Sequence, residues 1–344
     1  MPLGTRAPML PRWAPWATLA GGAVAGGLAA AAIGASPFVW LIFTGLITLA
    51  ATASWSLLVE GRRKAVDRGM TLLVVGAFVL AMIPLLSLVY TVVSKGLARF
   101  DGEFLGSSMR GVLAEGGGAF HAAMGTLIIT LVAALAAVPV GVMTAIYLVE
   151  YGKGRLKRAI TFFVDVMMGI PSIVAGLFAF ALFALFMGPG VRMGVMGSVA
   201  LAVLMIPIVI RSTEEMLRVV PDALREASYA LGVPKWLTVV RVVLPTALAG
   251  IVTGVMLSIA RVIGETAPLL ITTGSINSTN LNPFDGRMAN LPVFVYEEYK
   301  FPGVPPEAYI ERAWAGALLL ILMVMILFLA ARLIARRYGV EIRR

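Results

Sequence analysis

The feature that most constrains the fold of this chain is a succession of long apolar runs separated by short segments rich in lysine and arginine. A helical run of roughly 20 apolar residues matches the hydrocarbon thickness of a bilayer. Hydrophobic residues make up 60% of the 344 residues and charged residues only 13%, which is more apolar surface than a soluble chain of this length can bury. The sequence therefore predicts an all-α integral membrane protein.

The apolar runs predict about eight transmembrane helices, the fifth of them kinked at Gly169-Ile170-Pro171. Their predicted ranges are 13–35, 38–59, 69–93, 123–149, 159–186, 195–210, 246–272 and 313–333. The first run also has the charged start and the small residues of a signal peptide, so it is either a retained span, which its length favours, or a cleaved signal. If it is retained, the first two spans form a tight hairpin.

These runs and the charges between them divide the chain into successive parts. Residues 1–60 form an N-terminal extension with two spans, and 61–122 hold the third span and an external loop. Residues 123–333 form the core, and 334–344 form a basic tail. Lysine and arginine concentrate at the N-terminus, in the tail and in the loops that follow the second, fourth and sixth spans. Because such residues are retained inside, both termini of this multi-pass cell-membrane protein are predicted to be cytoplasmic.

Composition excludes several kinds of site. The chain has no cysteine and a single histidine, His121, which excludes disulfides, thiolate metal sites and multi-histidine sites. It also lacks the glycine-rich, lysine-containing loop that binds nucleotide phosphates. The net charge of +10 is spread over small clusters, which is typical of membrane proteins and not of nucleic-acid binding. We therefore expect no catalytic residue, metal or cofactor; an integral-membrane enzyme would need clustered His, Asp or Ser and is disfavoured.

A polar stretch leads directly into the seventh apolar run. It reads Arg225-Glu226-Ala227-Ser228, reaches Gly232, and after nine further residues continues as Val242-Val243-Leu244-Pro245. Gly232 stands where a residue of positive φ ends a short helix. An apolar stripe at helical spacing, suited to a shallow groove, is formed by Leu224, Ala227 and Leu231. The stretch is therefore either an ordinary loop between two spans or a helix that docks on a partner.

Three segments resemble one family. The spacing Glu226-Ala227-Ser228-x3-Gly232-x9-Val242-x-Leu244-Pro245 resembles the EAA loop of ABC-importer permeases, with serine for the second alanine and valine for the usual isoleucine. The stretches from Ala260 to Leu269 and from Gly169 to Phe178 are similar to PstA-type permease subunits of phosphate ABC importers. The resemblance extends over roughly residues 116–331.

The resemblance implies that the last five spans form a type I (MetI-like) importer core that alternates access for inorganic phosphate. It implies as partners a second, PstC-like permease subunit, two PstB-like ATP-binding subunits and an external PstS-like phosphate-binding protein, within the lipid bilayer and without nucleic acid. ATP hydrolysis is then expected on a separate subunit, which Glu226, Ala227 and Gly232 would contact. A permease of the same architecture for another oxyanion or small solute is the alternative.

Arg261 and Glu265 fall inside the seventh run, close to the middle of the bilayer if 246–272 is one helix. A charge at that depth costs about 3 kcal/mol, so it should face a pore or a partner. The two residues can pair and merely lock the helix, or Arg261 can offer planar donors to a passing oxyanion while Glu265 orients it. Arg211, at the cytoplasmic end of the sixth run, either lines the same path or is an interfacial arginine that reaches the headgroups.

Overall fold

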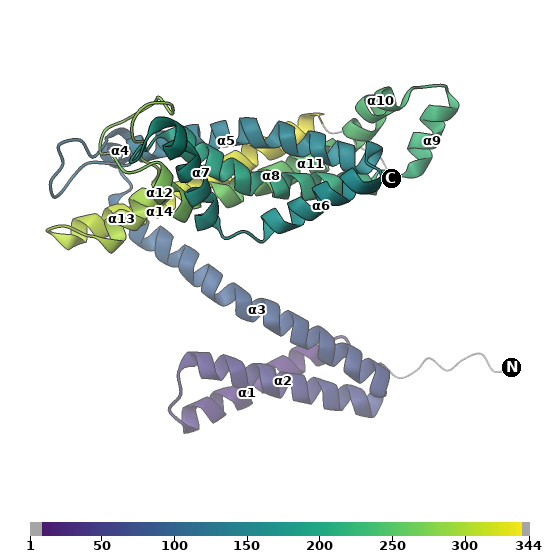
Figure 1. Ribbon diagram of the computed structural model, residues 1–344. Helices are drawn as coiled ribbons and strands as arrows, with labels where there is room; N and C mark the ends of the chain where they lie inside the picture. The colour runs from purple at the N-terminus through teal and green to yellow at the C-terminus, as the bar shows by residue number, and fades with distance from the viewer. Residues whose placement is uncertain (1–8, 339–344) are drawn as a thin grey trace. The chain divides into compact units, whose positions relative to one another are not determined.

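The computed structural model describes residues 9–338, and every regular element in that range is helical, as predicted (Figure 1). The chain divides into two compact units, the first ending at Tyr90 and the second beginning at Thr91. The division falls inside helix α3 (Arg62–Gly96). The predicted basic segments at the two ends, 1–12 and 334–344, both extend outside the described residues.

The first unit is built on a helical hairpin of α1 (Ala14–Ala32) and α2 (Pro37–Val59). The two helices approach closely because Gly22 and Gly26 have no β-carbon. A β-carbon added at Gly26 would lie 2.7 Å from the backbone nitrogen of Thr44. The hairpin predicted for the first two apolar runs is therefore present.

Glu60 closes this hairpin at the junction with α3. Its carboxylate accepts hydrogen bonds from the backbone N–H of Leu10 (2.9 Å) and the hydroxyl of Ser56 (2.7 Å), and it forms an ion pair with Arg68 at 2.7 Å. The hydrogen bond from Arg68 lowers the pKa of Glu60 from 4.5 to about 2. The carboxylate therefore stays charged at neutral pH and holds the start of α3 against the end of α2.

The core of the second unit lies between α5 (Phe120–Ile146) and α8 (Gly194–Val219). Small residues permit the approach: a β-carbon added at Gly141 would lie 2.6 Å from Cγ1 of Val209. Helices α11 (Leu244–Val262) and α14 (Pro306–Tyr338) pack on the same bundle. The buried side chains of this core include Ile129, Ala133, Ala137, Leu201, Met205 and Val209.

The chain of the second unit is bent sharply at Gly169-Ile170-Pro171. Helix α6 (Gly154–Met168) and helix α7 (Ser172–Met187) meet at 107°. Pro171 has no N–H with which to continue the hydrogen bonds of α6, and it instead precedes the first turn of α7. The predicted kink is confirmed, and it is a full break in the helix.

The seventh predicted span, 246–272, is not one helix, which corrects the sequence prediction. Helix α11 ends at Val262, residues 263–266 are not helical, and a separate short helix, α12 (Ala267–Thr272), follows. Pro268 lies in the first turn of α12, where a missing N–H costs little, but it could not have continued α11. Hydropathy does not show this break because the residues on both sides of it are apolar.

Six helices of the described chain are long and apolar enough to cross a membrane, or seven if the bent pair α6–α7 is counted as one span. The sequence predicts about eight spans, so the structure has fewer. The run 13–35 forms α1, which consists largely of alanine and glycine and is not among these helices. The small side chains of α1 make it only weakly hydrophobic for its length.

Short helices lie at the two ends of the second unit (Figure 1). At one end are α9 (Asp222–Ala230), α10 (Lys235–Thr238) and the π-helical turn η3 (Val239–Val243), which continues into α11. At the other end are α12, α13 (Leu291–Lys300), α4 (Gly102–Gly106) and the 3-10 turn η1 (Leu97–Arg99). Helix α8 runs from one end to the other, so a transmembrane length separates them.

Candidate functional site

A polar hairpin of α9 and α10 projects from the end of α8 and returns through η3 into α11; we call residues 222–243 the handle. Gly232 joins its two helices with a φ of 76°, which confirms the positive φ predicted for this residue. The hydroxyls of Ser228 and Thr238 are hydrogen-bonded across the turn at 2.8 Å. The handle is therefore a folded element with a defined conformation.

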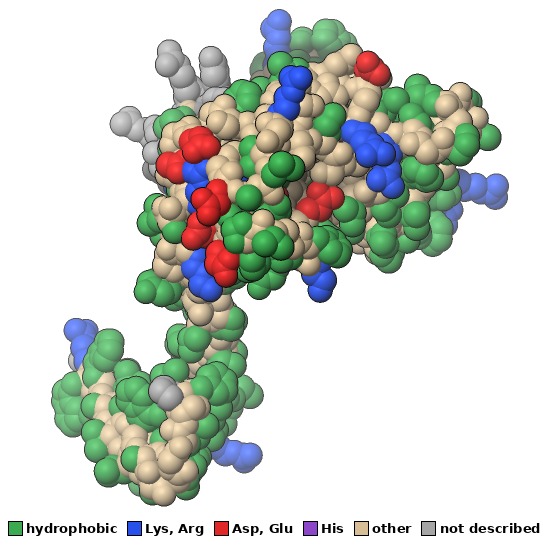
Figure 2. All heavy atoms as spheres, turned by 90° about the vertical axis from the view of Figure 1, so that its left-hand side faces the viewer, with side chains coloured by type: hydrophobic (Ala, Val, Ile, Leu, Met, Phe, Trp, Pro, Cys, Tyr) green, Lys and Arg blue, Asp and Glu red, His purple; other side chains and the backbone are tan. Residues whose placement is uncertain are grey.

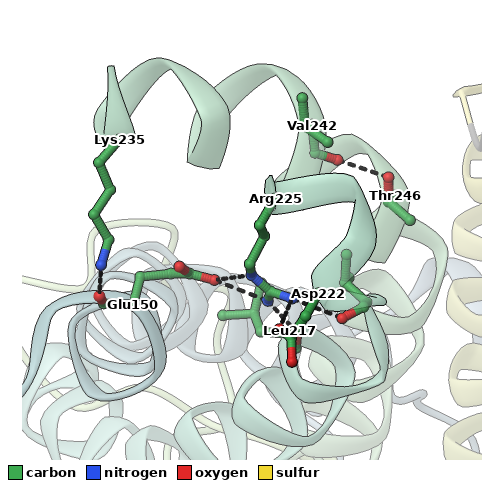
Figure 3. Close-up of polar contacts among 8 residues, drawn as sticks. Glu150, Leu217, Asp222, Arg225, Lys235, Val242 and Thr246 are labelled. Atoms are coloured by element: carbon green, nitrogen blue, oxygen red, sulfur yellow. Dashed lines mark hydrogen bonds and ion pairs between the residues drawn. The ribbon is translucent and has the colours of Figure 1, made fainter. Parts of the chain in front are cut away.

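A buried ion pair holds the handle to the helical bundle (Figure 3). Nε and Nη2 of Arg225 donate to Oε1 of Glu150 over 3.1 and 2.9 Å. Glu150 lies in η2 (Tyr147–Tyr151), the π-helical turn that follows α5. The side chains of Arg225 and Glu150 are only 13% and 5% exposed, so water hardly screens the pair. Removing one partner would leave the other charge buried and uncompensated.

Further bonds tie both helices of the handle to the bundle. Arg225 donates to the backbone carbonyls of Val220 (2.7 Å) and Leu217 (2.9 Å) at the end of α8. From α10, Nζ of Lys235 donates to the backbone carbonyl of Glu150 (Figure 3). The same ammonium group lies 5.1 Å from the centroid of the Tyr151 ring. Because α9 and α10 are both bonded to Glu150, in the turn that follows α5, these contacts couple the handle to that end of the bundle.

The handle exposes apolar side chains beside charged ones. Leu231 is 83% exposed. The other exposed residues include the predicted contact residues Glu226 and Ala227, together with Leu224, Tyr229 and Trp236. The predicted apolar stripe therefore faces outward. Apolar groups gathered on a polar hairpin are typical of a surface that a partner protein covers.

Arg211 does not project freely into a path. Its guanidinium donates to Asp165 of α6 and, over 2.9 Å, to Glu214 of α8. Glu214 is buried and also accepts a hydrogen bond from Arg218 over 2.6 Å. This network joins α6 to α8 and compensates the charge of Arg211 without a ligand or a lipid headgroup.

The structure does not bring Arg261 and Glu265 together. Arg261 is exposed in the last turn of α11, whereas Glu265 lies in the non-helical segment before α12. Neither side chain forms an ion pair or a hydrogen bond with another part of the described chain, 9–338. The expected pairing over one helical turn needs a continuous helix, and the break after Val262 removes it. An unpaired arginine beside a broken membrane helix should face a water-filled path or another subunit.

Sequence reasoning missed Glu150, Arg225 and Lys235 as the residues that fasten the handle. The local signal was weak: Glu150 is an acidic residue directly after an apolar run, and Arg225 is the first residue of the polar stretch. These two lie 75 residues apart, and nothing in a single sequence indicates that they meet.

Known proteins were found to be similar over most of the chain. The model of the family "Binding-protein-dependent transport system inner membrane component" matches residues 137–340. The phosphate transport system permease protein PstA 1 of Mycobacterium tuberculosis is 49% identical, over 79% of this chain and 90% of that protein. PstA of Mycobacterium leprae is 49% identical over 76% and 86%, and PstA of Pasteurella multocida is 39% identical over 72% and 86%.

A solved structure has a similar arrangement of helices. It is an inward-facing crystal form of the MetNI methionine ABC transporter, with a TM-score of 0.51 and 21% sequence identity. The similarity covers 63% of this chain and 94% of that one. At this identity it shows the fold alone, and it confirms the predicted MetI-like architecture for the matched part.

Proposed function

This chain belongs to the family of binding-protein-dependent transport system inner membrane components, in its PstA branch, and we propose on that premise that it is the membrane permease subunit of an ATP-driven importer of inorganic phosphate. The observation that carries the proposal is the handle, an exposed hairpin fastened by Arg225 to Glu150 and to the end of α8. Such an element can receive a push at one membrane surface and transmit it to the bundle. The chain itself is not an enzyme, and ATP is hydrolysed on a separate subunit.

The proposed assembly pairs this chain with a PstC-like permease subunit, two PstB-like ATP-binding subunits and an external PstS-like phosphate-binding protein. The exposed apolar side chains of the handle, Leu231 above all, support an ATP-binding subunit as the protein that covers them. The family description, which specifies dependence on a binding protein, supports the external partner. Glu226, Ala227 and Gly232 are the proposed contacts with the ATP-binding subunit.

Arg261 is the proposed anion contact of the translocation path. It has five N–H donors in a planar fork and no partner within residues 9–338. Glu265, in the segment that follows, would limit how tightly the anion is held, since permeation requires binding that is favourable but reversible. Arg211 is already paired with Asp165 and Glu214, so it would hold α6 against α8 beside the path and would not bind the anion itself.

Uptake by whole cells tests the proposed function. The cells should lack their own high-affinity phosphate uptake and express this chain with its partner subunits. We expect uptake of radiolabelled phosphate that disappears when this chain alone is omitted and that excess sulfate does not inhibit. Uptake of labelled sulfate in place of phosphate would favour the alternative permease for another oxyanion. Uptake of neither anion would reject phosphate import.

We also propose that both termini are cytoplasmic, because lysine and arginine concentrate in the sequence at the N-terminus, in the tail and in alternate loops, among them the loop that forms the handle. The chain has no cysteine, so single cysteines can be labelled without background. We expect Asn282→Cys to react with a membrane-impermeant thiol reagent in intact cells, and Arg155→Cys to react only after permeabilisation; both residues are exposed. Reaction of Arg155→Cys in intact cells would contradict this orientation.

A further inference from the structure

Two arginines meet at the end of the second unit that lies opposite the handle. Arg192 belongs to the turn between α7 and α8, and Arg287 to the loop between α12 and α13. Both side chains are exposed. Figure 2 views this end and shows a contiguous group of Lys and Arg side chains apart from a band of Asp and Glu.

The two arginines come together at Gly274, two residues after the end of α12. A β-carbon added at Gly274 would lie 3.1 Å from Cδ of Arg192 and 3.1 Å from Cδ of Arg287. The residue also has a φ of 67°, which favours glycine. Gly274 therefore leaves the space in which both side chains extend.

Backbone hydrogen bonds fix the segments that bear the two arginines. The N–H of Met193 donates to the carbonyl of Thr272, and the N–H of Met288 donates to the carbonyl of Thr273, each over 3.2 Å. Asn290 adds a bond from its amide to the hydroxyl of Thr273 over 3.0 Å. The residues that follow Arg192 and Arg287 are thus attached to consecutive carbonyls at the end of α12, so the arrangement is built into the fold.

The charges of this pair are not compensated. Neither guanidinium has a carboxylate within ion-pair distance or a hydrogen bond to another described residue. In contrast, carboxylates pair with Arg68, Arg99, Arg211, Arg218, Arg225 and Arg312. The Cδ atoms of both side chains lie close to Gly274, and like charges that share one region repel each other, although exposure to water weakens the repulsion. Arginines can also stabilise the C-terminus of a helix, but neither guanidinium bonds to the carbonyls of α12.

We propose that Arg192 and Arg287 form a receiving site for phosphate at the mouth of the path opposite the handle, an inference that rests on the proposed function. Two planar forks of N–H donors can bind several oxygens of one tetrahedral oxyanion, and the anion removes the repulsion between them. Because both side chains are exposed to water, binding is weak. Weak binding suits a site that accepts an anion from an external binding protein and passes it inward.

The number of phosphate ions transported per ATP hydrolysed tests this site. The complete complex in proteoliposomes, supplied with the phosphate-loaded binding protein, is compared with one that carries both Arg192→Gln and Arg287→Gln. We expect the ratio to fall about tenfold, the effect of losing charge-assisted hydrogen bonds, while ATP hydrolysis continues. Replacing both by lysine should restore part of the ratio. Arg110→Gln is the matched control, because Arg110 is an exposed arginine in the segment that follows α4 and has no carboxylate partner among residues 9–338.

Several outcomes would overturn the proposal. An unchanged ratio in the double glutamine variant would do so, and so would an equal loss of transport and ATP hydrolysis, which a purely structural or lipid-contacting role predicts. If a saturating concentration of binding protein restored both phosphate transport and ATP hydrolysis in the double glutamine variant, the arginines would contact that protein and not its anion. Failure of the wild-type complex to transport phosphate would reject the proposed function. In that case, protection of Arg192 and Arg287 from an arginine-selective reagent by inorganic phosphate still decides whether they bind an oxyanion.

Discussion

Arg225→Glu will abolish phosphate uptake while the chain stays in the membrane at its normal level. The substitution places a carboxylate against that of Glu150 and against the carbonyls of Leu217 and Val220. Breaking a buried pair from one side costs about 3–5 kcal/mol, which shifts the balance between a held and a released handle by at least roughly 100-fold. The outward surface of α9 is unchanged, so we expect the ATP-binding subunit still to bind. The measurement is phosphate uptake together with co-purification of that subunit.

The exchange of both charges gives the sharper comparison. Glu150→Arg combined with Arg225→Glu rebuilds the ion pair, but the carboxylate at 225 still faces two carbonyls, so we expect only part of the uptake to return. Asp222→Asn is the matched control, because Asp222 contacts the same arginine at 3.2 Å and is 87% exposed. A surface contact of this kind is worth at most about 1 kcal/mol, and the control should transport almost normally. Uptake by Arg225→Glu at the wild-type rate would contradict the role given to the pair.

Arg261→Gln will reduce uptake about tenfold or more, and adding Glu265→Gln will not restore it. If the two residues only balanced each other, the doubly neutral chain would leave no uncompensated charge and should work. Arg261 and Glu265 are not paired in the structure. The double variant therefore still lacks the anion contact of Arg261, and its uptake should stay low. Arg261→Lys keeps the charge but not the planar fork, and we expect intermediate uptake. Uptake is measured per amount of assembled complex; near-normal values for the double variant would leave Arg261 with a scaffolding role.

Features that depend on neighbouring residues could be predicted from the sequence. Gly232 has the predicted positive φ because it lies between two short helices and no other residue adopts that conformation as readily. The break at Pro171 follows from the missing N–H of proline, whatever surrounds it. The type of element along the apolar runs follows from the need to satisfy backbone hydrogen bonds inside a bilayer.

Features that depend on distant contacts or on small differences in hydropathy could not be predicted from the sequence. Glu150 and Arg225 meet only because α5 and α8 pack side by side, and this packing comes from residues elsewhere, such as Gly141 against Val209. The sequence predicts Arg261 and Glu265 on one helix because the rest of the run 246–272 is largely apolar. Pro268 was the available signal that this run is divided, since proline is common in the first turn of a helix and rare later.

The central claim is that ATP hydrolysis on the ATP-binding subunit drives phosphate through this chain by way of the handle. Accumulation of radiolabelled phosphate in proteoliposomes tests it most directly. The vesicles contain the purified complex with either the wild-type chain or Arg225→Glu, with ATP on the side of the handle and the loaded binding protein on the other side. The wild-type complex is predicted to accumulate phosphate only when both are present, and the variant to hydrolyse ATP without accumulation. Accumulation by the Arg225→Glu complex at the wild-type rate, or none by the wild-type complex under any condition, would contradict this account.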